Sequence, residues 1–223
     1  MTEPLIDSFG RLHSNLRVSV TDRCNIRCFY CMPDENVRFK PRSEILTFEE
    51  IERLVRVATA RGITKLRITG GEPLVRAELP TLVGRLAAIA GVEDIALTTN
   101  GILLAEQAEA LCEAGLQRLN ISLDGLSDKT FERIARRPGL AKVLEGIRVA
   151  QQLPFKKIRL NAVAIAGISE EEIIPLGRFA REEQLELRFI EFMPLDAEGN
   201  WQPQQVLQGE TIRALLEDAF GPL

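Results

Sequence analysis

Short runs rich in β-branched residues alternate with longer amphipathic stretches along the chain, and this alternation constrains the fold more than any other feature. Six runs have the length of strands, at 16–20, 65–69, 94–98, 118–122, 157–165 and 185–191. Helical patterns lie between and after them, at about 47–61, 79–90, 104–115, 127–135, 140–152, 169–183 and 209–219. Strands and helices that alternate in this way predict β-α units and a parallel sheet.

Six such units without an antiparallel pair predict an α/β fold, an open and partial (β/α)6 barrel of the TIM-like kind. In barrels of this type the chemistry is carried by the loops at the carboxyl ends of the strands. The unusual segments of this sequence fall there: the cysteine loop, TGGEP, TTNG, SLDG and EFMP. We therefore expect five strand ends to meet at one rim of the barrel.

Three of the four cysteines, Cys24, Cys28 and Cys31, lie within eight residues in the spacing C-x-x-x-C-x-x-C. A closed structural zinc site takes four ligands, and the fourth cysteine, Cys112, lies far away in a helical pattern. A loop with three thiolates suits an iron–sulfur cluster that keeps one iron open to a small molecule. Two alternatives stay open: a zinc site completed by His13, and buried cysteines without a metal.

The charge balance excludes some classes of partner. A formal net charge of -4 over 223 residues argues against nonspecific binding to nucleic acid, which needs a basic surface. An anionic substrate would require a local group of arginines. The N-terminal ten residues contain no apolar targeting region and no apolar run is long enough to span a membrane, so we expect a cytoplasmic protein with no membrane partner. Clustered thiols in that reducing compartment favour metal ligands over disulfides.

The motifs also carry a family resemblance. The cysteine loop with Tyr30, together with Thr69-Gly70-Gly71-Glu72-Pro73, resembles the radical S-adenosylmethionine (radical SAM) enzymes. The longer segments FGRLHSNLRVSVTDRCNIRCFYCMP, LRITGGEPLVR, ALTTNG, LNISLDGL and LRFIEFMP are similar to the GTP 3′,8-cyclases, a family that acts in molybdenum-cofactor biosynthesis. The resemblance covers essentially the entire chain, with the motifs in the same order and at matching spacings.

The resemblance implies a lyase with two cofactors, a [4Fe-4S] cluster on Cys24, Cys28 and Cys31 and S-adenosylmethionine (SAM). It implies that SAM is contacted by Tyr30, Gly71, Ser122 and Met193. It implies that GTP is contacted by Arg17, Arg67, Thr98 and Arg159, although most of the family has lysine at the last position. The implied reaction begins with a 5′-deoxyadenosyl radical that takes a hydrogen from C3′ of GTP, after which C3′ attacks C8 of guanine. An electron donor is an implied partner.

The family continues into a C-terminal domain with a second cluster, for which residues 1–223 contain no counterpart. We therefore expect the chain to be the radical SAM core domain. We also expect an exposed apolar face on the last helix (Ile212, Leu215, Leu216 and Phe220), with self-association as a homodimer. Two other functions stay open: a radical SAM enzyme with a peptide substrate, and a non-catalytic metal-binding module.

Overall fold

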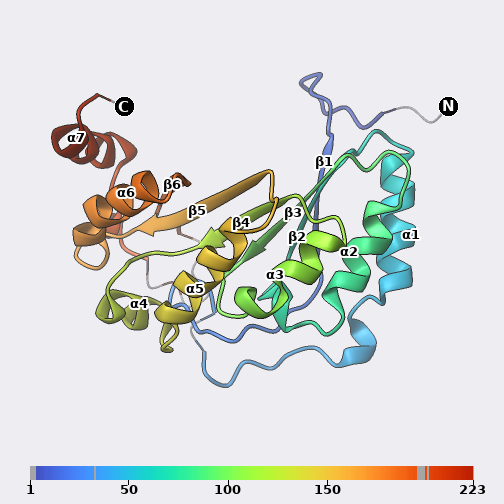
Figure 1. Ribbon diagram of the computed structural model, residues 1–223, viewed down its shortest axis with the longest axis horizontal. Coiled ribbons are helices and arrows are strands. Elements are labelled where there is room, and N and C mark those ends of the chain that lie inside the picture. The colour runs from blue at the N-terminus through green and yellow to red at the C-terminus, as the bar shows by residue number, and fades with distance from the viewer. Residues whose placement is uncertain (1–3, 33, 195–198, 200, 223) are drawn as a thin grey trace.

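The computed structural model describes residues 4–32, 34–194, 199 and 201–222, and its centre is one six-stranded sheet (Figure 1). All neighbouring strands are parallel, in the order β1-β2-β3-β4-β5-β6. The strands are β1 (Asn15–Ser19), β2 (Lys65–Thr69), β3 (Asp94–Thr99), β4 (Arg118–Ser122), β5 (Lys157–Ala164) and β6 (Glu186–Glu191). The order equals the order along the chain, as expected for successive β-α units of an open, partial barrel. The predicted fold class is confirmed.

Helices follow the strands and cover one face of the sheet (Figure 1). The helices are α1 (Phe48–Thr59), α2 (Leu79–Ala87), α3 (Leu104–Glu113), α4 (Asp128–Ala135), α5 (Leu140–Gln151), α6 (Ile173–Glu182) and α7 (Gly209–Phe220). Alternate residues such as Leu66, Ile68 and Leu97 are buried in the core against these helices. The intervening strand residues point to the other face, which is therefore free to form a site.

The predicted boundaries agree closely with the structure except at the sixth helix. A pattern over 169–183 predicts one helix, but Glu170–Glu172 form a 3₁₀ turn and α6 starts at Ile173. This start places Pro175 in the first helical turn, where its missing N–H group removes no intrahelical hydrogen bond. Within the described residues, no helix is long and apolar enough to cross a membrane.

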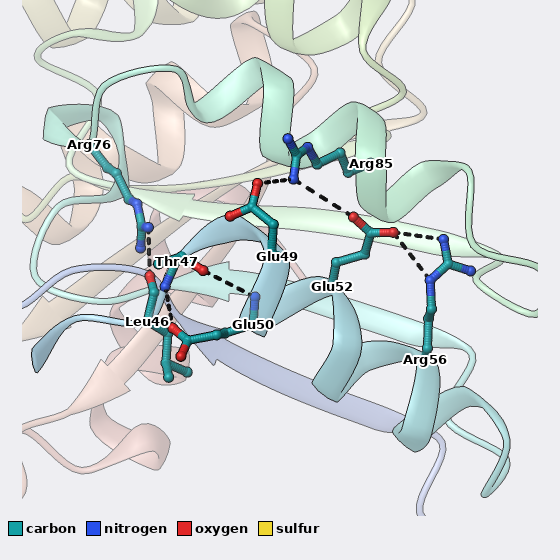
Figure 2. A network of polar contacts seen from close by, with 8 residues as sticks. All are labelled: Leu46, Thr47, Glu49, Glu50, Glu52, Arg56, Arg76 and Arg85. Carbon is teal, nitrogen blue, oxygen red and sulfur yellow. Dashed lines mark hydrogen bonds and ion pairs between the residues drawn. The ribbon is translucent and has the colours of Figure 1, made fainter. Parts of the chain in front are cut away.

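Polar contacts join α1 to α2 and join the segment before α1 to the loop after β2 (Figure 2). Thr47 and Glu50 form a reciprocal capping box at the start of α1, and Arg85 of α2 reaches Glu49 at 2.5 Å. Arg76, in the segment after TGGEP, donates to the carbonyl of Leu46 at 2.7 Å and lies 4.5 Å from the ring centre of Phe48. These contacts connect the loop after β2 to the segment that leads into α1.

The expected exposed face on the last helix is largely wrong. Helix α7 packs on α6, where the aromatic ring of Phe220 and the side chain of Leu216 lie close against Gly177. Ile212 is buried, and of the four apolar residues only Leu215 counts as exposed, at 37%. Gly177 allows this close packing because a side chain there would occupy the space of both residues. The apolar face therefore gives little support to self-association, and the homodimer stays a prediction.

Candidate active site

The cysteine loop follows β1 and lies against the TGGEP segment that follows β2. The backbone N–H groups of Gly71 and Glu72 each donate at 2.8 Å, to the carbonyls of Thr21 and Arg23. A Cβ atom on Gly71 would lie 2.3 Å from the carbonyl oxygen of Arg23, and one on Gly70 would lie 2.4 Å from that of Thr21. Both glycines are therefore needed for the two loops to approach each other, in addition to the role in SAM binding that the resemblance implies for Gly71.

The other side of the cysteine loop is attached to the end of α4. The N–H groups of Arg27 and Phe29 donate to the carbonyls of Ala135 and Ile134, at 2.9 and 3.1 Å. Within the loop, the N–H of Cys31 donates to the carbonyl of Cys28 at 2.9 Å. The loop is thus supported by the segment after β2 and by α4, which lie far apart in the sequence.

The three cysteines of the loop are free thiols and close enough to influence one another. Burial raises the pKa of Cys24, Cys28 and Cys31, and for Cys24 and Cys28 the neighbouring cysteines add to the rise. In the described part of the chain, no three residues of the types His, Cys, Asp and Glu converge on a point that could hold a single metal ion. A [4Fe-4S] cluster would bind each thiolate through a different iron. Its three cysteines can therefore lie farther apart than the ligands of a single metal ion.

Two buried polar atoms of the same loop have no hydrogen-bond partner among the described residues, Asp22 Oδ1 and Arg27 Nε. Buried polar groups are normally satisfied, and two exceptions in one short loop indicate that the loop is completed by a bound group. The three thiols and the unpartnered Nε–H donor of Arg27 fit an iron–sulfur cluster, whose sulfur atoms accept hydrogen bonds, whereas Asp22 Oδ1 is an acceptor that the cluster itself would not satisfy.

The alternative of a zinc site completed by His13 is wrong. His13 precedes β1, whereas the cysteines follow it, so the strand separates them. The imidazole is 55% exposed and its Nε2 lies 3.7 Å from Asp7 Oδ2. Cys112 lies on α3 and is partly buried there, apart from the cysteine loop.

A cavity of about 250 Å³ opens on the face of the sheet opposite the helices. Its wall contains five of the predicted contact residues, Tyr30 and Ser122 from the SAM set and Arg17, Arg67 and Thr98 from the GTP set. Thr69, Asp124, Asn161, Val163 and Ile190 complete it. Residues from all six strands, or from the loops that follow them, thus share one concave surface.

Three predicted contact residues, Gly71, Met193 and Arg159, are not part of this wall. Met193 is 50% exposed and follows Phe192, whose ring centre lies 6.2 Å from that of Phe29 and 6.4 Å from that of Tyr30. This aromatic contact brings the segment after β6 against the cysteine loop, and so places Met193 near the loop.

Tyr30 is held in place by Asp124, which is not among the site residues predicted from the sequence. The phenol donates to Asp124 Oδ2 at 2.7 Å, while Asp124 Oδ1 accepts from the N–H of Val163 at 2.8 Å. Burial raises the pKa of Asp124 to about 6 and that of Tyr30 well above its usual value, where the carboxylate of Asp124 also contributes. Asp124 therefore joins the cysteine loop to the ends of β4 and β5. Its position in SLDG, directly after a strand, was the available signal.

The face that carries the cavity is strongly basic. Arg17 and Arg67 are register partners on β1 and β2, and neither forms an ion pair within the described residues. Burial lowers the pKa of Arg67, and the positive charges of Arg17, Arg118, Arg159 and Arg188 lower it further. Arg118 is paired with Asp94. Two arginines without an ion pair among the described residues thus lie beside further cations, an arrangement that can hold an anion despite the negative net charge of the chain.

Arg159 lies on the same face but is paired. Its Nε donates to Glu186 Oε1 at 2.9 Å, and Glu186 also pairs with Lys157 and Arg188. The side chain of Arg159 is only 13% exposed. To contact a substrate, its guanidinium would have to use the donors that Glu186 leaves free.

The cations around Glu186 lead to a prediction about stability. Lys157, followed by Arg159 and Arg188, lowers the pKa of Glu186 to about 2. A lowered folded-state pKa stabilises the fold above the unfolded value of about 4.5, and this contribution disappears as the pH falls towards about 2. We expect Glu186→Gln to lower the free energy of unfolding by on the order of 2 kcal/mol at pH 7, since the partly exposed group is screened.

The measurement is urea unfolding of the unsubstituted protein and of Glu186→Gln at several pH values. The difference between them should shrink by more than half between about pH 5 and pH 3. Glu182→Gln, at an exposed glutamate without an ion pair in the described part of the chain, should show no such change. A difference for Glu186→Gln that stays constant over this range would contradict the assignment.

Glu72 connects TGGEP to the segment after β3. Its carboxylate is 1% exposed and accepts from the N–H of Leu74, the hydroxyl of Thr99 and the N–H of Asn100, at 3.0, 2.7 and 2.6 Å. Burial raises the pKa of Glu72, and these three donors oppose the rise. The motifs TGGEP and TTNG are thus one hydrogen-bonded unit, which their separation in the sequence does not reveal.

The parallel partial barrel and its three-cysteine loop define the class of the protein. The family model described as the Radical SAM superfamily matches residues 18–180, and the chain belongs to this superfamily. Membership implies a [4Fe-4S] cluster and SAM as the cofactors. Within the superfamily, the chain is similar to GTP 3′,8-cyclases. The protein of that name from Rhodopirellula baltica is 54% identical over 224 residues, or 99% of this chain and 62% of the relative.

A second relative has a similar identity, and two solved structures share the fold. The GTP 3′,8-cyclase of Lactiplantibacillus plantarum is 45% identical over 92% of this chain and 62% of its own length. The chain thus spans about three fifths of these two relatives. Streptococcus suis SuiB has a TM-score of 0.73 at 21% identity, over 92% of this chain and 45% of SuiB. Methylornithine synthase (PylB) has a TM-score of 0.72 at 16% identity, over 94% of this chain and 63% of PylB. These two likenesses show the fold.

Proposed function

We propose that this chain is the core of a radical SAM lyase that acts on GTP, forming the 3′,8-cyclised nucleotide of molybdenum-cofactor biosynthesis. The observation that carries the proposal is the shared cavity wall, on which Arg17 and Arg67 lie beside Tyr30, Thr98 and Ser122 without an ion pair to any described residue. A triphosphate is a polyanion that arginine can bind with two parallel hydrogen bonds. The similarity to proteins named GTP 3′,8-cyclase supports the choice of nucleotide.

In the proposed site, Cys24, Cys28 and Cys31 hold the cluster, and Tyr30, Gly71, Ser122 and Met193 contact SAM. Arg17, Arg67, Thr98 and Arg159 contact GTP. When bound, the cluster and SAM supply a 5′-deoxyadenosyl radical for hydrogen abstraction from C3′ of GTP. The protein excludes water and holds the two small molecules in reach of each other. An external electron donor, a cytoplasmic location and the extent of the radical SAM core over residues 1–223 are parts of the same proposal.

The test is anaerobic reconstitution with iron and sulfide, followed by iron analysis and an assay for 5′-deoxyadenosine from SAM and dithionite. We expect about four irons per chain and a yield of 5′-deoxyadenosine that rises with GTP. The triple substitution of Cys24, Cys28 and Cys31 by alanine should abolish both, while Cys112→Ala should retain them. Four irons without any effect of GTP would reject the substrate, and a colourless protein after reconstitution would reject the cluster site.

A further inference from the structure

Asn100 follows β3 and lies against the cysteine loop. Its side chain is 8% exposed, and its Nδ2 donates to Asn25 Oδ1 at 2.7 Å. The same Nδ2 lies 3.9 Å from the Sγ of Cys24, within the range of a long N–H···S hydrogen bond. Asn100 also borders a small cavity that Cys28, Tyr30 and Ser122 line as well.

The orientation of this amide is determined by its neighbours. Asn100 Oδ1 accepts from the N–H of Ile102 at 3.1 Å, and a backbone N–H can only donate. The oxygen must therefore face Ile102, and the NH₂ group must face the cysteine loop. One of its two N–H groups is used by Asn25, and the second is available to the sulfur of Cys24.

The backbone on both sides of this contact is also fixed. Glu72 accepts from the N–H of Asn100 at 2.6 Å, and it donates its own N–H to the carbonyl of Arg23, next to Cys24, at 2.8 Å. The amide and the sulfur are thus positioned by the same buried glutamate. Because Glu72 fixes the backbone at Asn100 and next to Cys24, we expect the contact between Asn100 Nδ2 and Cys24 Sγ to persist when the sulfur becomes a ligand.

We propose that Asn100 donates a hydrogen bond to the Cys24 thiolate and thereby sets the reduction potential of the cluster. The inference rests on the proposed function, in which Cys24 is a cluster ligand. Reduction adds negative charge that is shared with the thiolates, so a donor to sulfur stabilises the reduced form and raises the potential. Asn100 acts through Cys24 and is a positioning residue.

The test variant is Asn100→Thr. The threonine hydroxyl can accept from the N–H of Ile102 in place of Asn100 Oδ1, but it is too short to reach Cys24 as well. After reconstitution, an EPR-monitored redox titration should show a more negative midpoint potential. We expect the ratio of reduced to oxidised cluster at a fixed potential to fall about ten-fold, which equals about 59 mV for one electron.

Gln107→Ala is the matched control. Gln107 is a partly buried amide on α3 that donates to the carbonyl of Leu74 at 2.9 Å, and no contact joins it to a cysteine in the described residues. Its removal should leave the potential unchanged. An Asn100→Thr cluster with the potential of the unsubstituted protein would overturn the inference.

A second measurement begins with the unsubstituted protein, so its main result does not depend on how well Asn100→Thr folds. Asparagine labelled with ¹⁵N at the side-chain amide is incorporated into the unsubstituted protein, and the reduced cluster is studied by pulsed EPR. We expect a ¹⁵N coupling to the reduced cluster in the unsubstituted protein. The variant Asn25→Ser removes the neighbouring asparagine and should retain this coupling. Absence of the coupling from the unsubstituted protein, or its loss with Asn25→Ser, would overturn the inference. Failure of the unsubstituted protein to assemble any cluster would instead reject the proposed function, and the inference with it.

Discussion

Replacing both Arg17 and Arg67 by alanine is expected to weaken GTP binding by at least about 100-fold. Each guanidinium faces the cavity without a carboxylate partner among the described residues, so its donors are free for a phosphate. A hydrogen bond to a charged group contributes about 1.5–3 kcal/mol, and two such losses correspond to about 10²–10⁴ in affinity. Anaerobic titration calorimetry with GTP on the reconstituted protein measures the change.

The control is the double variant Arg56→Ala and Arg213→Ala, which removes the same charge from the surface. Both arginines pair with a glutamate of their own helix, Glu52 and Glu217. Their loss should change GTP affinity by less than two-fold or so in physiological salt, because distant surface charges are screened. An unaltered affinity in the Arg17 and Arg67 variant would favour the other substrate class weighed from the sequence, a peptide, which gives no reason for these arginines.

Replacing Glu72 by alanine is expected to lower the free energy of unfolding by about 3–5 kcal/mol. The substitution leaves three buried donors without an acceptor, the N–H groups of Leu74 and Asn100 and the hydroxyl of Thr99. It also separates the loop after β2 from the loop after β3, and with them the support of the cysteine loop. Urea unfolding of the metal-free chain measures the effect.

Glu72→Gln distinguishes the loss of the acceptors from the loss of the carboxylate charge. The amide oxygen can replace Oε1, which accepts from Leu74 and Thr99, while the NH₂ group faces the N–H of Asn100. We expect this variant to be about 1–2 kcal/mol more stable than Glu72→Ala. Glu109→Gln on the exposed side of α3 should change the stability by less than about 0.5 kcal/mol. Equal stability of Glu72→Ala and Glu109→Gln would show that the three contacts contribute nothing.

The local pattern of the chain was sufficient to predict the strands and most helix boundaries. The reason is that period-two and helical alternation are local properties, set by which residues face the core. The start of α6 lies later than the sequence pattern predicted, because Pro175 is tolerated only near a helix start. The apolar face of α7 was predicted to be exposed and is largely covered, for another reason. Phe220 and Leu216 contact Gly177 of α6, and sequence periodicity cannot predict which two helices pack against each other.

The sequence by itself determined the parallel barrel, the three-cysteine loop and the rim on which the motifs meet. Only the tertiary structure decided which of these residues contact one another. Tyr30 meets Asp124, Glu72 meets Asn100, and Arg159 meets Glu186, across separations of 94, 28 and 27 residues. Such pairs leave no periodic signal, because their partners come from different strands and their geometry depends on the register of the sheet. The register also placed Arg17 beside Arg67 with no carboxylate of the described residues near enough to pair, and that arrangement makes the basic face a candidate binding site.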